Sequence, residues 1–201
     1  MGRLATDLKW KENPMSRFER LNETNAPAAS IPLIEKSKKA FGRLPGLHAV
    51  MAGAPALLDG YQVLHRLFAE ETSFDPEEKT VVWQTINVAH ECHYCVPAHT
   101  GIAKAMKVSD EVIDALRDET PLPTSKLEAL RTFTLAMLES RGNPTEEQID
   151  AFYAEGYGDQ QVLEVILGLA QKLMSNYTNH IAKTPVDAPF EKFSWTRASK
   201  R

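Results

Sequence analysis

Both cysteines of this 201-residue chain lie in one short stretch, His90 to His99, which reads His-Glu-Cys-His-Tyr-Cys-Val-Pro-Ala-His. Cys92 and Cys95 are separated by two residues, within reach of a disulfide between them, and no third cysteine is left over. Such a pair is typical of a reducing compartment, where it cycles between thiol and disulfide and does not staple the fold. We therefore expect a cytoplasmic protein whose fold rests on its hydrophobic core.

The spacing of this motif suits a helix that carries reactive thiols. At about 100° per residue, Cys95 lies about 60° and His99 about 20° from Cys92 around a helix axis, so the three share one face. Cys95 and His99 are four residues apart, where helical side chains meet, and we expect His99 to accept the proton of the Cys95 sulfur. A second thiol beside an activated one is typical of a redox centre. His93 and Tyr94 point elsewhere and would flank the site or pack.

Composition and charge exclude several classes of partner. With 43% hydrophobic residues, the chain can bury one full core, or one helical domain with an appended arm. The net charge is −4 and no basic stripe interleaved with aromatic residues is present, which argues against nucleic acid as a partner. The apolar run 162–170 is broken by Glu164 and is far shorter than the roughly 20 residues of a membrane span. The polar start of the chain shows no signal-peptide pattern.

Helix signals recur along most of the chain, with apolar residues at helical spacing between capping and stopping residues. The clearest start is Asp75-Pro76-Glu77-Glu78, with a capping Asp, a Pro at the first helical position and acidic residues in the first turn. This helix should reach His90, and after a turn at His90–Glu91 the next should begin near Cys92, where its positive end would lower the thiol pKa values. Other helices are expected at 16–21, 31–41, 47–51, 55–68, 109–116, 124–142 and 145–156, and from a cap at Asp159 to about residue 180.

The sequence therefore predicts an all-α protein with one helical domain. Residues 1–30 are rich in charge, Asn, Pro and Ala, and we expect an N-terminal arm that lies over the body or a neighbouring subunit, or that is disordered. Residues 31–190 should form the domain, and residues 191–201 a basic tail that carries Trp195.

The pattern Cys-x-x-Cys-x-x-x-His, formed by Cys92, Cys95 and His99, resembles the signature of the alkyl hydroperoxidase D (AhpD) and carboxymuconolactone decarboxylase superfamily. The resemblance covers roughly residues 31–190 and is strongest at 74–103. It also extends to the segments Phe74–Lys79, Gly156–Val165 and Asn176–Phe190. It implies an AhpD-like fold of packed helical hairpins with a Cys-x-x-Cys-bearing helix, assembled as a homo-oligomer, either a trimer or a hexamer.

The resemblance also implies a thiol-dependent peroxidase with antioxidant activity. His99 would draw the proton from Cys95, the thiolate would attack a small-molecule hydroperoxide, and the sulfenic acid would condense with Cys92 to a disulfide. An external dithiol or a thiol protein would reduce the pair. No cofactor and no metal are expected.

One departure from the family pattern concerns the proton relay. Peroxidases of the family carry a glutamate twelve residues before the first cysteine, where this chain has Thr80. Glu77, Glu78 and Glu91 are candidates to replace it, although capping also explains Glu77 and Glu78. Further candidates to line the site are Thr80, His93, Tyr94 and His180.

Three other readings of the motif remain open. The superfamily also contains carboxymuconolactone decarboxylase-type lyases, which do not need the cysteine pair. Cys92, Cys95 and His99 could bind zinc with His90 or His93 as a fourth ligand, although four ligands within ten residues of helix are awkward to converge. Finally, the cysteine pair could be structural, in a protein that acts as an interaction module.

Overall fold

The computed structural model describes residues 18–197, and every regular element in that range is a helix. The elements are η1 (Ala28–Ser30), α1 (Ile31–Phe41), α2 (Gly46–Met51), α3 (Pro55–Glu71), α4 (Pro76–Ala89), α5 (Cys95–Ala105), α6 (Asp110–Asp118), α7 (Ser125–Glu139), α8 (Glu146–Ala154), α9 (Asp159–Ala182) and η2 (Ala188–Phe193). The predicted all-α class is confirmed. None of these helices combines the length and the apolar character needed to cross a bilayer.

Several helices begin and end at the residues that the sequence indicated. At α4, Asp75 Oδ1 accepts a hydrogen bond from the Glu78 N–H at 2.8 Å, and Glu78 Oε2 accepts one from the Asp75 N–H at 3.0 Å. Thr145 and Gln148 form the same reciprocal capping box at the start of α8. Gly42, with φ of 68°, ends α1 in the left-handed conformation that glycine adopts without strain.

Two expected helix starts are wrong. The helix after the turn begins at Cys95 and not near Cys92, because Glu91 has φ of 51° and the turn extends over residues 90–94. The cap of α9 is Gly158, whose N–H donates to Gln161 Oε1 at 3.0 Å, and Asp159 is the first helical residue.

The described parts of both terminal segments pack on the helical body. The Leu21 N–H donates to the Ala49 carbonyl of α2 at 2.9 Å. The backbone at Leu21 is therefore held by a tertiary contact with α2. The helix predicted at 16–21 does not form over residues 18–21, and residues 16 and 17 lie outside the described range. In the tail, Trp195 Nε1 donates to the Arg117 carbonyl at the end of α6 at 2.8 Å.

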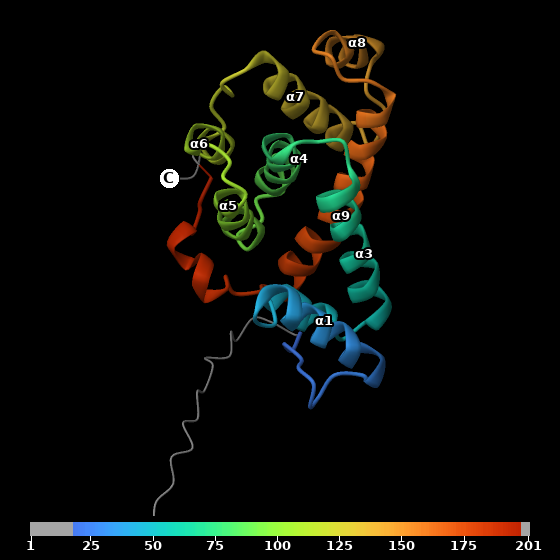
Figure 1. Ribbon diagram of the computed structural model, residues 1–201, viewed down its shortest axis with the longest axis vertical. Coiled ribbons are helices and arrows are strands. Elements are labelled where there is room, and N and C mark those ends of the chain that lie inside the picture. The colour runs from blue at the N-terminus through green and yellow to red at the C-terminus, as the bar shows by residue number, and fades with distance from the viewer. Residues whose placement is uncertain (1–17, 198–201) are drawn as a thin grey trace, which may run out of the picture.

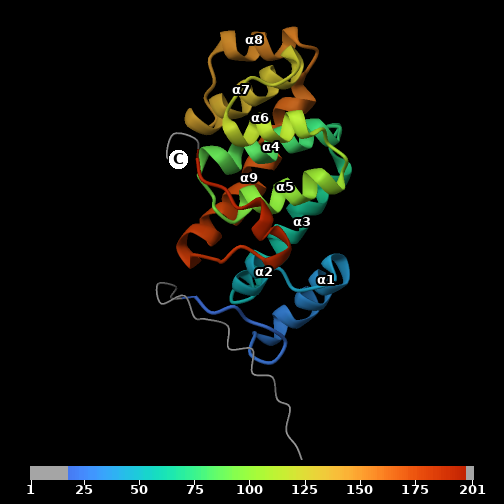
Figure 2. The ribbon, with the colours of Figure 1, turned by 90° about the vertical axis from the view of Figure 1, so that its left-hand side faces the viewer.

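The helices are stacked along the long axis of the molecule, from α8 at one end to α1 at the other, and α9 runs beside both halves (Figures 1 and 2). One hydrophobic core is formed mainly by α4, α6, α7 and α8, and a second by α1, α2, α3 and the residues around the cysteines. Helix α4 is buried continuously from Thr80 to Val88, as expected for a central helix. The cysteine motif therefore follows directly from the most buried helix and enters the second core.

Candidate active site

Cys92 and Cys95 are both buried free thiols, held at the junction between the turn and α5. The Cys92 carbonyl accepts a hydrogen bond from the Val96 N–H at 3.1 Å, and its sulfur accepts one from the Cys95 N–H at 3.4 Å. Cys95 is the first residue of α5, whose N-cap is Tyr94, and Cys92 lies in the turn just before it. The positive end of a helix favours a thiolate at this point.

Cys95 lines a cavity of about 430 Å³ that is partly open to solvent. Cys92 is not among the lining residues, so the two thiols differ in access although they are adjacent. Seven aromatic rings contribute to the wall: Phe41, His48, Tyr61, His65, Tyr94, His99 and Phe190. The polar side chains in the wall include Arg43, His99, Lys172 and Asp187.

The predicted hydrogen bond between His99 and Cys95 is not formed. His99 Nε2 lies 2.9 Å from Lys172 Nζ of α9, and Nδ1 is buried without a partner. The imidazole packs edge-on against Trp83, with ring centroids 4.9 Å apart. Burial and the charge of Lys172 hold the pKa of His99 well below its ordinary value of 6.5. His99 lines the cavity beside Cys95. Its ring nitrogen Nε2, however, contacts Lys172, which is distant in sequence, and does not accept the thiol proton of Cys95.

The sulfur of Cys95 accepts a hydrogen bond from Asn179 Nδ2 of α9 at 3.3 Å. Burial alone would raise the pKa of this thiol, but the Cys92 thiol, the charge of Lys172 and the amide of Asn179 lower it to about 6. The pKa of Cys92 is raised, first by its hydrogen bond to Cys95 and then by burial. These directions favour Cys95 over Cys92 as the thiolate of the pair.

Sequence reasoning missed the polar residues that α9 contributes to the site. Lys172, Asn176 and Asn179 are fully buried. Asn176 Nδ2 donates to Asn87 Oδ1 of α4 at 3.0 Å, and its Oδ1 lies 2.9 Å from His90 Nδ1. These residues recur at helical spacing on one face of α9, and that polar row is the signal that could have revealed them.

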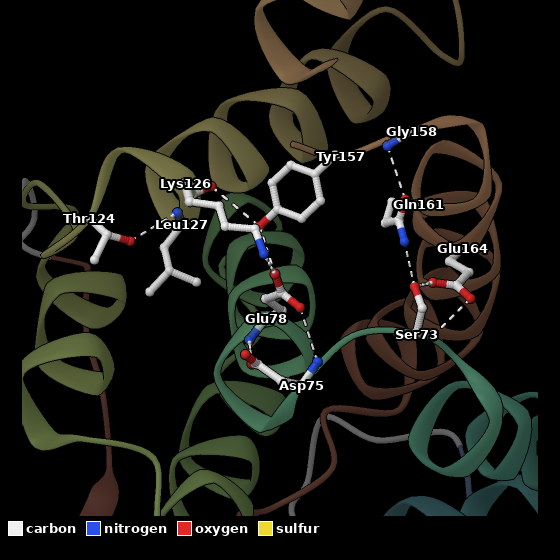
Figure 3. A network of polar contacts seen from close by, with 10 residues as sticks. All are labelled: Ser73, Asp75, Glu78, Thr124, Lys126, Leu127, Tyr157, Gly158, Gln161 and Glu164. Atoms are coloured by element: carbon white, nitrogen blue, oxygen red, sulfur yellow. Dashed lines mark hydrogen bonds and ion pairs between the residues drawn. The ribbon is translucent and has the colours of Figure 1, made fainter. Parts of the chain in front are cut away.

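The glutamates that were candidates for the proton relay do not reach the thiols. Glu78 is held by the capping box, by Lys126 at 2.9 Å and by the Tyr157 hydroxyl at 3.1 Å (Figure 3). Glu91 forms an ion pair with Arg197 at 3.3 Å. Neither residue lines the cavity, and neither does Glu77.

Of the four residues proposed to line the site, Tyr94 does so. Its hydroxyl donates to Asp187 Oδ2 at 2.6 Å, which ties the turn to the segment before η2. Thr80 donates to the Pro76 carbonyl within α4, and His93 Nε2 contacts the Thr184 carbonyl at 2.8 Å. His180 lies in a separate shallow hollow with Tyr177 and Ile181. Thr80, His93 and His180 are therefore outside the cavity.

The zinc reading finds no support in the geometry. Over residues 18–197, no three His, Cys, Asp or Glu side chains converge in a way that could hold a metal ion. The two residues considered as a fourth ligand are directed elsewhere, because His90 contacts Asn176 and His93 contacts the Thr184 carbonyl.

Comparison with known proteins gives a family match for part of the chain and solved structures of similar fold. Residues 55–131 match the model of the carboxymuconolactone decarboxylase family. A similar solved structure is described as an alkylhydroperoxidase AhpD core, an uncharacterized peroxidase-related protein from Ralstonia eutropha JMP134. Its TM-score is 0.75 at 19% identity, covering 88% of this chain and 95% of that one.

Two further structures share the fold. An uncharacterized peroxidase-related protein from Silicibacter sp. TM1040 has a TM-score of 0.72 at 16% identity, covering 90% of this chain and 96% of that one. The debrominase Bmp8, as a cysteine-to-alanine variant in complex with 2,3,4-tribromopyrrole, has a TM-score of 0.69 at 19% identity, covering 89% and 94%. A search of curated proteins found no match.

The matched segment 55–131 contains α3 to α6, including Cys92, Cys95 and His99. The helical fold extends the likeness over most of the chain. Residues 55–131 are thus similar to the carboxymuconolactone decarboxylase family, and the helical fold of the chain is similar to that of the AhpD-core and peroxidase-related structures.

Proposed function

We propose that this protein is a thiol-dependent peroxidase that reduces an organic hydroperoxide through Cys95 and Cys92. The observation that carries the proposal is the state of Cys95, a thiol at the wall of a cavity whose contacts lower its pKa to about 6. At neutral pH such a thiol is mostly thiolate, the form that acts as a nucleophile. Cys92 lies beside it as a protonated thiol, ready to resolve the oxidised product.

The first step oxidises Cys95. The thiolate attacks the terminal oxygen of the hydroperoxide, the S–O bond forms, and the O–O bond breaks. Cys95 becomes a sulfenic acid, and the alkoxide that leaves takes up a proton and departs as the alcohol. The cavity is far larger than the space for one water, so its size suits an organic hydroperoxide.

The second step forms a disulfide between Cys92 and Cys95. The sulfur of Cys92 attacks the sulfenic sulfur of Cys95, the S–S bond forms, and the hydroxyl group leaves as water with the thiol proton of Cys92. An external dithiol, either a small molecule or a thiol protein, then reduces the disulfide through a mixed disulfide.

The test is single-turnover oxidation of the reduced protein by cumene hydroperoxide, followed by intact mass. The wild type should lose two mass units within seconds. Cys92→Ser should gain one oxygen, which a sulfenic-acid trap captures, and Cys95→Ser should not react. Rapid oxidation that persists in Cys95→Ser would overturn the assignment of the attacking thiol, and no oxidation in wild type would overturn the activity.

A second candidate is reductive dehalogenation of a halogenated aromatic compound. Its support is the set of seven aromatic rings in the cavity wall and the fold shared with the debrominase Bmp8. The Cys95 thiolate would attack the bromine, the carbon would take up a proton, and Cys92 would then displace bromide to form the disulfide. Release of bromide from 2,3,4-tribromopyrrole, with loss of two mass units from the protein, would favour this activity over the peroxidase.

We also propose that the protein is a homo-oligomer. A row of apolar side chains on α9 is exposed, comprising Leu163, Ile166, Tyr177 and Ile181, of which Ile181 is 65% exposed. A contiguous row of this kind is costly to leave in water. Light scattering after size exclusion should give a multiple of 22.5 kDa, and Ile166→Glu should reduce it.

A further inference from the structure

Lys172 is buried completely in the middle of α9, and its ammonium group reaches the wall of the cavity. Burial of a lysine is costly unless its charge is balanced. Burial lowers the pKa of Lys172, and the charges of Cys95 and Cys92 oppose that shift by favouring the ammonium form. Within residues 18–197, no carboxylate forms an ion pair with Lys172. The lysine and the thiol pair are thus each other's electrostatic partners.

The chemistry of the contact with His99 determines the protonation of that histidine. Lys172 Nζ lies 2.9 Å from His99 Nε2. A charged ammonium group has three donors and no acceptor, so Nε2 must accept, and the proton of the neutral imidazole is on Nδ1. In this arrangement His99 cannot also receive the thiol proton at Nε2.

The other titratable groups around Lys172 are neutral or paired at neutral pH. Burial lowers the pKa of His65 on α3 to about 4 and raises the pKa of Tyr61. Arg43 and Asp187, which also line the cavity, form an ion pair at 3.0 Å. Lys172 is therefore the positive charge available to the Cys95 thiolate.

Resting on the proposed thiol chemistry, we propose that Lys172 is the positioning residue of the site: its ammonium holds Cys95 as the thiolate and keeps His99 neutral. The sequence motif suggests that His99 activates Cys95 by accepting its proton, whereas Lys172 of α9 stabilises the thiolate by its positive charge. None of the glutamates considered for the proton relay, Glu77, Glu78 and Glu91, lines this cavity.

The test measures the thiolate of Cys95 without any peroxide. In a Cys92→Ser background, the rate of alkylation by iodoacetamide is followed by mass between pH 4 and pH 10. Lys172→Met keeps the side-chain volume but removes the charge. It should raise the pH of half-maximal alkylation by at least one unit and slow alkylation at pH 6 at least fivefold. Lys172→Arg, which keeps the charge, should restore most of the rate.

Lys126→Met is the matched control, because Lys126 pairs with Glu78 of α4 (Figure 3) and is not among the residues that line the cavity. It should leave the alkylation profile unchanged. If Lys172→Met does not fold, as judged by circular dichroism, Lys172→Gln takes its place. A profile for the neutral variant that overlays the parent protein would overturn the role of Lys172. A shifted profile in a protein that no hydroperoxide oxidises would overturn only the peroxidase activity.

Discussion

Replacing Asn179 by leucine should lower the reactivity of Cys95 while leaving the fold nearly as stable as before. Asn179 is fully buried, and its Nδ2 donates to Cys95 Sγ at 3.3 Å. Its Oδ1 is buried without a hydrogen-bond partner. The side chain therefore stabilises the thiolate with one atom and costs folding free energy with another. Leucine has a similar shape and removes both effects.

The magnitude follows from these two atoms. A hydrogen bond to a charged group contributes about 1.5–3 kcal/mol, which corresponds to a pKa increase of about 1–2 units at about 1.4 kcal/mol per unit. The pKa of Cys95, about 6 in the wild type, should rise accordingly. Below the wild-type pKa the thiol is neutral, so the hydrogen bond contributes little there. Loss of the unpaired oxygen removes a penalty of about 1–3 kcal/mol, so the free energy of unfolding at pH 5 should stay close to the wild-type value or rise.

Two measurements check this prediction. The pH dependence of iodoacetamide alkylation reports the thiolate, and urea unfolding at pH 5 reports stability. The matched substitution is Asn176→Leu, one turn away on α9. Both ends of the Asn176 amide are paired, with Asn87 and His90, so this variant strands the buried amide of Asn87 and the half-buried ring of His90 and should lose about 2 kcal/mol or more.

The reasoning is refuted if Asn179→Leu loses as much stability as Asn176→Leu, because the unpaired oxygen would then carry no penalty. It is also refuted if the alkylation profile of Asn179→Leu matches the wild type. That result would mean that the hydrogen bond to the sulfur does not stabilise the thiolate.

Three further substitutions test other parts of the structure. Gly101→Ala would place its Cβ 2.5 Å from the ring of Phe190, so we expect the free energy of unfolding in urea to fall by about 1–3 kcal/mol. Because the displaced ring widens the cavity, N-ethylmaleimide should also alkylate Cys95 faster. An unchanged stability and alkylation rate would contradict the close contact. Trp83→Phe removes the 2.9 Å hydrogen bond to Gln171 Oε1, so the free energy of unfolding should fall by about 2 kcal/mol. A fall as small as that of a surface substitution, within about 0.5 kcal/mol, would show that Gln171 finds another partner. Burial opposes the shift, but the contacts of Glu78 with Lys126 lower the pKa of that carboxyl from 4.5. The contribution of the ionised carboxylate to stability is therefore present above pH 4.5 and is lost as pH falls through the lower folded pKa. In thermal unfolding, the melting temperature of Glu78→Gln should decrease less over this acid range than that of the wild type.

Much of the secondary structure could be predicted because residues close in sequence determine where many helices begin and end. Asp75 with Glu78 and Thr145 with Gln148 carry their capping contacts within four residues, so neighbouring sequence suffices to place α4 and α8. The start of α5 could not be placed, since it depends on the left-handed conformation of Glu91. A non-glycine residue rarely adopts that conformation without support from its surroundings.

The sequence by itself determined which atoms could react: two thiols three positions apart, near a histidine, on helical segments of one all-α domain. It did not determine their partners. An i, i+4 rule places His99 beside Cys95, but such a local pairing is worth only a few tenths of a kcal/mol. Lys172 and Asn179 reach the same groups from α9, more than seventy residues away in sequence. In a buried site of low dielectric their charge and hydrogen bonds outweigh the local pairing, so only the packing of α9 against α5 decided how the thiolate is held.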